Sequence, residues 1–246
     1  KGIEYMITWG ISAMSHDAAL AVFDQGQLVY ASHSERYSRV KNDKNLHPAQ
    51  LQEALQYGDP EFFFFYENPL KKKWRQLWAG QFDLLTKPSP HAMLRNMGVP
   101  ISNYKYMDHH HSHAAYAYFT QPEFEDCDVL VIDSIGESET MTVWHGRGRK
   151  LEREFSQSYP HSVGLWYSAM TQRLGLKPQE HEYILMGMAA LGDSDRFYKT
   201  IKADFFEQIP NGACYEPKVL FKQNLHRGCM GWRPDLNSVS DMVDIA

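Results

Sequence analysis

The sequence contains few cysteines and no long apolar run. Its three cysteines, Cys127, Cys214 and Cys229, include no CxxC pair, so neither a disulfide framework nor a cysteine zinc site is indicated, and we expect them to be packing residues. No segment approaches the roughly 20 consecutive apolar residues that span a bilayer. The first residues also lack the basic-then-apolar layout of a signal peptide. These absences predict a cytoplasmic protein with no membrane partner.

The chain also lacks an excess of basic residues. Its 25 lysines and arginines are outnumbered by 30 aspartates and glutamates, which leaves no positive field to neutralise nucleic-acid phosphates. The hydrophobic fraction of 43% is that of a globular protein with a real core. We therefore expect a small-molecule substrate and no nucleic-acid partner.

The pattern of apolar residues predicts an α/β fold. We expect an antiparallel meander of strands first, then helices with further strands between them. The predicted strands are 4–11, 18–23, 28–32, 129–133 and 139–144, and the predicted helices are 47–57, 109–119, 161–174, 182–191 and 194–206. Residues from about 60 to 100 contain FFFFY, three consecutive lysines and several prolines. We interpret this stretch as a helical, aromatic-rich insertion outside the sheet.

The two ends of the sequence predict a longer protein. The chain begins with Lys1 rather than Met, and a capped helix that begins at Ser238 stops after about two turns, which is too short to be stable alone. We therefore expect residues 1–246 to be a fragment of a longer protein.

The clearest candidate site is DHHHSH, residues 108–113, at the start of a predicted helix. Residues four apart share one helix face, so His109 and His113 can point both imidazoles at one ion. Asp133 ends an apolar strand, where α/β sheets present ligands, and is a candidate third ligand. The alternatives are solvated or core-capping histidines and an aspartate that caps the next turn. Two imidazoles with carboxylates suit iron(II), zinc or manganese better than calcium or magnesium.

Two turns of small and polar residues are candidate phosphate sites, because backbone N–H groups can approach an anion there. The first contains Ser12 and His16. His16 is either a general base or phosphate donor, or an ordinary polar turn residue. The second turn contains Gly136, Glu137 and Ser138.

A third candidate for anion binding is the cluster of Arg36, Arg39 and Lys41. Three cations within six positions can clamp a phosphate or a carboxylate. The alternative is a solvated face with local ion pairs.

Four ordered segments together resemble the O-carbamoyltransferases, which include the nodulation carbamoyltransferases and the enzymes that tailor cephamycin and tobramycin. The segments are GISAMSHDAALAVFDQGQLVYASHSERYSRVKND, DHHHSHAAYAYF, VLVIDSIGE and HSVGLWYSAMTQRLGLKPQEHEYILMGMAALGD. The resemblance implies that residues 1–246 are the incomplete amino-terminal part of a domain of the actin, Hsp70 and sugar-kinase (ASKHA) type. In the complete protein this domain would be followed by a YrdC-like domain.

The resemblance also implies a reaction. The YrdC-like domain joins carbamoyl phosphate and ATP into carbamoyl-adenylate, and the kinase-like domain transfers the carbamoyl group to a hydroxyl of a sugar or natural product. The family's metal, iron(II) or a substitute, holds the phosphate of the adenylate. The family's metal-binding histidines fall on His109 and His113, its first aspartate ligand on Asp133, and the histidine of its HDAA motif on His16.

The chain departs from the family pattern at a few positions. Ser34 replaces the first glutamate of the usual EER, Ser134 replaces the glycine of the usual Asp-Gly, and Ile184 replaces a lysine in EYKVMGLA. Two alternative functions follow. A threonylcarbamoyl transferase acting on tRNA is disfavoured by the acidic balance and the HDAA turn. A catalytically silent binding or regulatory module is supported by the changes at Ser134 and Ile184.

Overall fold

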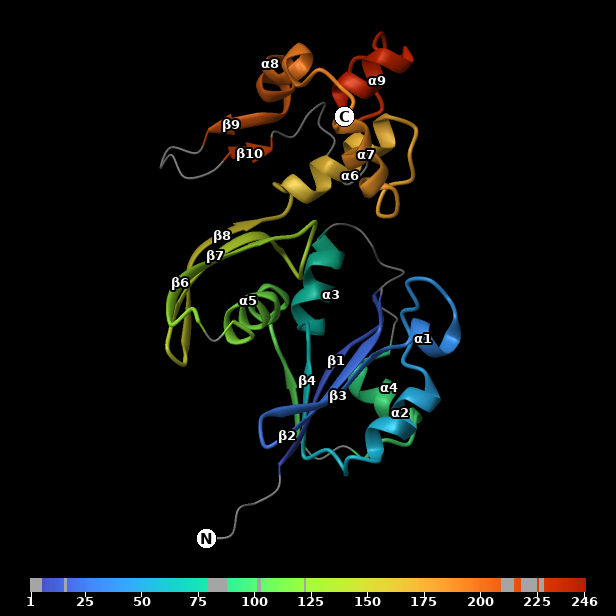
Figure 1. Ribbon diagram of the computed structural model, residues 1–246, viewed down its shortest axis with the longest axis vertical. Helices are drawn as coiled ribbons and strands as arrows, with labels where there is room; N and C mark the ends of the chain where they lie inside the picture. Colours follow the sequence, from blue (N-terminus) through green and yellow to red (C-terminus); the bar gives the residue numbers. More distant parts are fainter. Residues whose placement is uncertain are drawn as a thin grey trace. The chain divides into compact units, whose positions relative to one another are not determined.

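The computed structural model describes residues 6–15, 17–78, 88–100, 103–121, 123–208, 215–217, 225 and 228–246. The chain divides into two compact units, residues 1–116 and 117–246, and Figure 1 labels most of their elements. Within the described residues, no helix is both long and apolar enough to cross a membrane.

The first unit is built on a mixed sheet of five strands in the order β3-β2-β1-β4-β5. These strands are β1 (Ile7–Ser12), β2 (Ala19–Asp24), β3 (Gln27–His33), β4 (Phe62–Phe65) and β5 (Asn103–Tyr106). β2 is antiparallel to both β1 and β3, whereas β4 is parallel to both β1 and β5. The antiparallel meander predicted for the first three strands is therefore confirmed.

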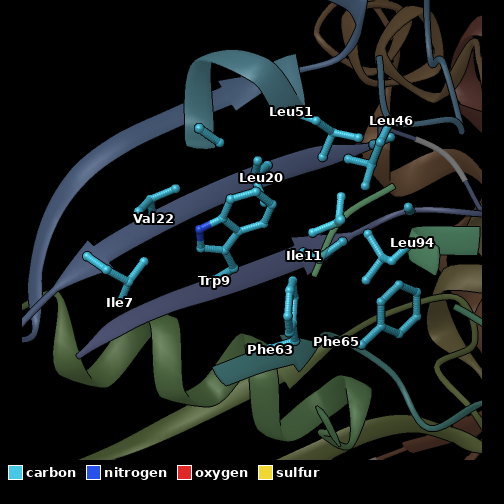
Figure 2. Packing of buried hydrophobic residues seen from close by; sticks show 14 residues of the cluster. Ile7, Trp9, Ile11, Leu20, Val22, Leu46, Leu51, Phe63, Phe65 and Leu94 are labelled. Carbon is cyan, nitrogen blue, oxygen red and sulfur yellow. The ribbon is translucent and has the colours of Figure 1, made fainter. Parts of the chain in front are cut away.

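Helices cover one face of this sheet. The helices that lie wholly within the unit are α1 (Glu35–Ser38), α2 (Pro48–Leu55), α3 (Pro69–Trp78) and α4 (Pro90–Asn96). Buried side chains of the sheet, among them Trp9 and Phe63, pack with Leu51 from α2 and Leu94 from α4, as Figure 2 shows. The rings of Trp9 and Phe63 meet edge to face with 5.6 Å between centroids, a favourable arrangement for aromatic pairs. This core fixes the strands that lead toward the candidate site.

The prediction that residues 60–100 form a helical insertion outside the sheet is wrong for the aromatic run. Phe62–Phe65 is β4, which lies between β1 and β5. Its side chains alternate, with Phe63 and Phe65 almost fully buried and Phe62 and Phe64 half-buried. A run of identical residues hides this two-residue period, so the strand pattern could not be seen in the sequence. The later part of the stretch does contain α3 and α4, and residues 79–87 lie outside the described residues.

The second unit combines an antiparallel sheet with a group of helices. Its three-stranded sheet has the order β6-β7-β8. The strands of the unit are β6 (Asp126–Ile132), β7 (Glu139–Arg147), β8 (Lys150–Ser158), β9 (Phe206–Gln208) and β10 (Tyr215–Pro217). Its helices are α6 (Val163–Arg173), α7 (Glu182–Ala189), α8 (Ser194–Phe205) and α9 (Val239–Ile245). The predicted helix cap at Ser238 is confirmed, because Ser238 and Asp241 form a capping box at the start of α9.

The helices of the second unit share a core of their own. Leu165 and Met170 of α6 pack with Leu185 of α7, Phe197 of α8 and Ile245 of α9. Both units thus combine strands and helices, as the α/β prediction requires. The mixed order of the first sheet, in which only β2 runs against the other strands, agrees with the ASKHA type, and that fold class is confirmed.

Candidate metal centre

The histidine-rich segment forms the start of α5 (His109–Phe119), with the bounds predicted from the sequence. Two hydrogen bonds attach this start to the end of β4. The backbone N–H of Met107 donates to the carbonyl oxygen of Phe65 at 2.9 Å, and the Ser112 hydroxyl donates to the carbonyl oxygen of Tyr66 at 2.9 Å. The first turn of α5 is therefore fixed to the central part of the sheet.

An ion pair from α3 adds a further attachment. The Lys71 ammonium lies 2.7 Å and 2.8 Å from the two carboxylate oxygens of Asp108, the residue just before α5. This pair is partly exposed, so its own contribution to stability is small, about 0–1 kcal/mol. Its main effect is to fix the position of the residue that leads into the histidines.

His109 and His113 lie one helical turn apart with their ring nitrogens facing each other. The two Nε2 atoms are 3.0 Å apart, and the rings meet edge to face with 4.7 Å between centroids. Tyr66 packs edge-on against His109 with 5.2 Å between ring centroids, which restricts the rotation of that imidazole. His110, in contrast, is completely buried.

The separation of these nitrogens fits two ligands of one metal ion. With metal–nitrogen bonds of about 2.0–2.1 Å, neighbouring ligand atoms lie roughly 3.0–3.4 Å apart. The same distance also suits a hydrogen bond from one neutral ring to the other. The prediction that His109 and His113 share one face of a helix is confirmed by this geometry.

Asp133 belongs to the second unit, directly after β6. Its backbone N–H donates to the carbonyl oxygen of Thr140 on β7 at 3.0 Å, so the strand pairing extends to this residue. One carboxylate oxygen of Asp133 accepts a hydrogen bond from the N–H of Ser134 at 2.6 Å. This bond orients the carboxylate within its own turn, and the expected position at a strand end is confirmed.

The buried Ser162 supports this turn from the start of α6. Its hydroxyl donates to the carbonyl oxygen of Ser134 at 2.7 Å and accepts from the N–H of Leu165 at 3.0 Å. The same oxygen atom thus caps a helix and fixes the residue after Asp133. The helix also comes very close, because a Cβ placed on Gly164 would lie 2.7 Å from the Cα of Ser134.

The other residues predicted for the site are less closely defined. His16 lies outside the described residues. Ser12 ends β1 and lines a cavity of about 370 Å³ in the first unit. In the second predicted phosphate turn, Glu137 is 2% exposed, and the N–H of Gly136 donates to the carbonyl oxygen of Glu139 at 2.8 Å. Ser138 is exposed. Phosphate binding at these positions stays a prediction.

The candidate anion clamp lies on the surface after β3. Arg36, Arg39 and Lys41 are all exposed, and the ammonium of Lys41 lies 3.6 Å from the carboxylate of Glu35. The neighbouring Ser34 is fully buried and its hydroxyl donates to the side chain of Gln50 at 2.6 Å. The departure from the family pattern at Ser34 therefore has a structural role, whereas the clamp stays a prediction.

Two supporting residues, Lys71 and Ser162, were not predicted from the sequence. The approach of Lys71 to Asp108 depends on the placement of α3, which gives no local signal. A serine just before an apolar helical pattern does signal a helix cap, so one of the two roles of Ser162 was visible. Its contact with Ser134 could not be predicted, because the two residues are far apart in the chain.

Comparison with known proteins agrees with the resemblance seen in the sequence. Residues 95–227, more than half of the chain, match the family model of the carbamoyltransferase N-terminus. The uncharacterized protein sll1178 of Synechocystis sp. is 34% identical over 214 residues, which cover 75% of this chain and 34% of that protein. The nodulation protein NolNO of Sinorhizobium fredii is 25% identical over 211 residues, which cover 80% of this chain and 31% of that protein.

The solved structures include a Ppx/GppA family member from Aquifex aeolicus. It is 15% identical, and the match covers 77% of this chain and 63% of that chain, with a TM-score of 0.31. The chain spans about a third of the length of the two curated relatives described above. The match over residues 95–227 nevertheless shows that the chain belongs to the carbamoyltransferase family, in whose amino-terminal region it lies.

Proposed function

We propose that the chain is the acceptor-carbamoylating part of an O-carbamoyltransferase. In this proposal a YrdC-like domain elsewhere in the complete protein makes carbamoyl-adenylate and pyrophosphate from carbamoyl phosphate and ATP. The units described here then transfer the carbamoyl group to a hydroxyl of a sugar or natural product. The observation that carries the proposal is the His109–His113 pair, with 3.0 Å between Nε2 atoms, in a chain that matches the family model.

The donor set fits a divalent transition metal. The two imidazoles lie on one face of α5, and Asp133 supplies a carboxylate that suits iron(II), with zinc or manganese as substitutes. When bound, the ion would offset negative charge on the phosphate of the adenylate. We propose that His109, His113 and Asp133 hold it, with further ligands supplied by the rest of the protein.

His16 is the proposed general base. The acceptor oxygen attacks the carbamoyl carbon, His16 takes the proton of the acceptor hydroxyl, and AMP leaves with the electrons of the broken carbon–oxygen bond. The support for His16 is the match of His16-Asp17-Ala18-Ala19 to the family's HDAA motif. Ser12 in the same turn, the turn of Gly136, and the cations Arg36, Arg39 and Lys41 are proposed to contact phosphate groups.

The proposal separates into two reactions that can be measured independently. The full-length protein, supplied with iron(II), ATP and carbamoyl phosphate, should release pyrophosphate and carbamoylate a hydroxyl acceptor chosen from a panel of sugars and aminoglycosides. His16→Asn should lower transfer by about 10²- to 10⁴-fold, the usual contribution of a general base. Pyrophosphate release should remain, because adenylate formation takes place in the other domain.

His145→Asn provides the matched control, since His145 lies on β7 and forms ion pairs only with Asp126 and Asp128 of the neighbouring strand in the contacts described. It should keep both reactions. Transfer at the wild-type rate in His16→Asn would remove His16 from the mechanism. Pyrophosphate release that does not depend on carbamoyl phosphate would overturn the proposed donor.

A further inference from the structure

Tyr66 is the first residue after β4, and both of its backbone groups bond to neighbouring elements. Its N–H donates to the carbonyl oxygen of Ile11 on β1 at 3.1 Å. Its carbonyl oxygen accepts a hydrogen bond from the hydroxyl of Ser112 on α5 at 2.9 Å. The backbone of Tyr66 is therefore held on one side by the sheet and on the other by the first turn of α5.

The ring of Tyr66 contacts both the core of the first unit and the candidate ligand His109. It meets the ring of His109 at an interplanar angle of 61°, with 5.2 Å between centroids. It also packs against the ring of Phe65 with 5.1 Å between centroids. Phe65 is only 1% exposed, so the tyrosine ring rests against a side chain that is fixed in the core. The position of His109 is thus linked to that core through Tyr66.

The two candidate histidine ligands are held unequally. His109 is half-buried and packs against Tyr66, whereas His113 is exposed on α5. The Nε2 atoms of the two histidines nevertheless lie 3.0 Å apart. A ligand whose rotamer is fixed before the metal arrives binds it more tightly, because less side-chain freedom is lost on binding. His109 is the preorganised member of this pair.

We propose that Tyr66 is a positioning residue for the metal centre, whose aromatic ring fixes the rotamer of His109 and thereby raises the affinity for a divalent metal. This inference rests on the proposed metal site at His109 and His113. Residues that orient a metal ligand typically contribute about 10- to 100-fold in metal affinity. The proposed effect comes from the ring of Tyr66 rather than from its hydroxyl, so phenylalanine should be able to replace the tyrosine.

The zinc affinity of the full-length protein, measured by competition with a chromophoric chelator, tests this role. Tyr66→Ala should weaken zinc binding by about tenfold or more, and Tyr66→Phe should keep the wild-type affinity. Phe64→Ala is the matched control, because Phe64 is another half-buried aromatic residue of β4 and its ring lies 5.9 Å from the ammonium of Lys105. It should keep the wild-type affinity. Wild-type affinity in Tyr66→Ala, or equal losses in Tyr66→Ala and Tyr66→Phe, would overturn the proposal.

A spectroscopic measurement distinguishes positioning from a general loss of structure. Cobalt(II) bound in place of zinc absorbs visible light in a way that depends on the geometry of its ligands. Tyr66→Ala should change this spectrum while the fold stays intact by circular dichroism. An unchanged spectrum, or an equal loss of zinc affinity in Phe64→Ala, would overturn the role of Tyr66.

The wild-type protein separates this inference from the proposed function on which it rests. If the wild type binds neither zinc nor cobalt, the proposed metal centre is wrong and the role of Tyr66 is wrong with it. If the wild type binds zinc and Tyr66→Ala binds it equally well, only the role of Tyr66 is contradicted.

Discussion

The hydroxyl of Ser162 donates a hydrogen bond to the carbonyl oxygen of Ser134 at 2.7 Å. Through this bond the start of α6 fixes the residue that follows the candidate ligand Asp133. The same hydroxyl accepts from the N–H of Leu165, so one buried atom links the stability of the helix to the geometry of the turn.

Ser162→Ala should therefore destabilise the protein by about 1–2 kcal/mol, from the lost helix cap and the unsatisfied carbonyl group. Chemical denaturation measures this change. Ser158→Ala is the control, because Ser158 is exposed at the end of β8 and surface changes usually stay within about 0.5 kcal/mol. Equal stability of the two variants would show that Ser162 does not support the turn.

Gly164→Ala tests the close approach of α6 to the Asp133 turn. Alanine normally stabilises a helix relative to glycine by up to about 1 kcal/mol. Here a Cβ would lie 2.7 Å from the Cα of Ser134, so we expect a net loss of roughly 1–3 kcal/mol. Gly187→Ala in α7 is the matched control. A Cβ there meets nothing within 4 Å, so that variant should be slightly stabilised, and a similar gain at Gly164 would contradict the close packing.

Arg173 fixes the segment before α9 by donating to three backbone carbonyl oxygens. Its guanidinium lies 2.7 Å from the oxygen of Trp232, 2.6 Å from that of Arg233 and 2.9 Å from that of Leu236. Arg173→Met should cost about 2–4 kcal/mol in the free energy of unfolding, because these acceptors lose their donor in a buried region. Arg149→Met, at an exposed turn, should change the stability by less than about 0.5 kcal/mol.

The contact between α8 and α9 should weaken in acid. The Asp241 carboxylate accepts a hydrogen bond from the Ser238 hydroxyl, which lowers its pKa below the usual 3.8. The Asp244 carboxylate accepts one from the Asp193 N–H, which lowers its pKa in the same way. The Arg196 guanidinium beside both carboxylates lowers both pKa values further. A carboxylate whose pKa is lower in the folded than in the unfolded protein stabilises the fold at pH values above its unfolded pKa. This stabilisation is lost as the pH falls through its folded pKa. Denaturation curves from pH 7 down to about pH 2 should show the loss below about pH 4.

The double variant Asp241→Asn with Asp244→Asn provides the comparison. It should be less stable than the wild type at pH 7, and its stability should fall less steeply below about pH 4, because two groups that take up protons have been removed. Parallel curves for the two proteins would show that these carboxylates do not carry the acid sensitivity.

Local patterns predicted much of the fold. The helix at His109–Phe119 was predicted with its observed bounds, because four-residue spacing and a run of small apolar residues are local signals. β8 (Lys150–Ser158) was missed, since KLEREFSQS is largely polar and most of its side chains are exposed. Pairing with β7 makes it a strand, and such tertiary context is not visible in the sequence.

The candidate site was predictable only in part, for the same reason. Helix geometry predicts that His109 and His113 lie on one face of α5, and the end of an apolar strand predicts the position of Asp133. The attachments from Lys71 and Ser162 connect residues far apart in sequence, and they depend on how α3 and α6 pack. The sequence therefore identified the candidate ligands but not the residues that hold them.

The metal content of purified full-length variants tests directly whether His109 and His113 hold a divalent metal. His109→Ala and His113→Ala should each lower bound iron, or the zinc or manganese that replaces it, by at least about tenfold, because removing a ligand leaves an incomplete site. His111→Ala should keep the wild-type content, because residue 111 lies on another face of α5. Wild-type metal content in His109→Ala and His113→Ala, with the fold intact by circular dichroism, would show that these histidines do not hold the metal.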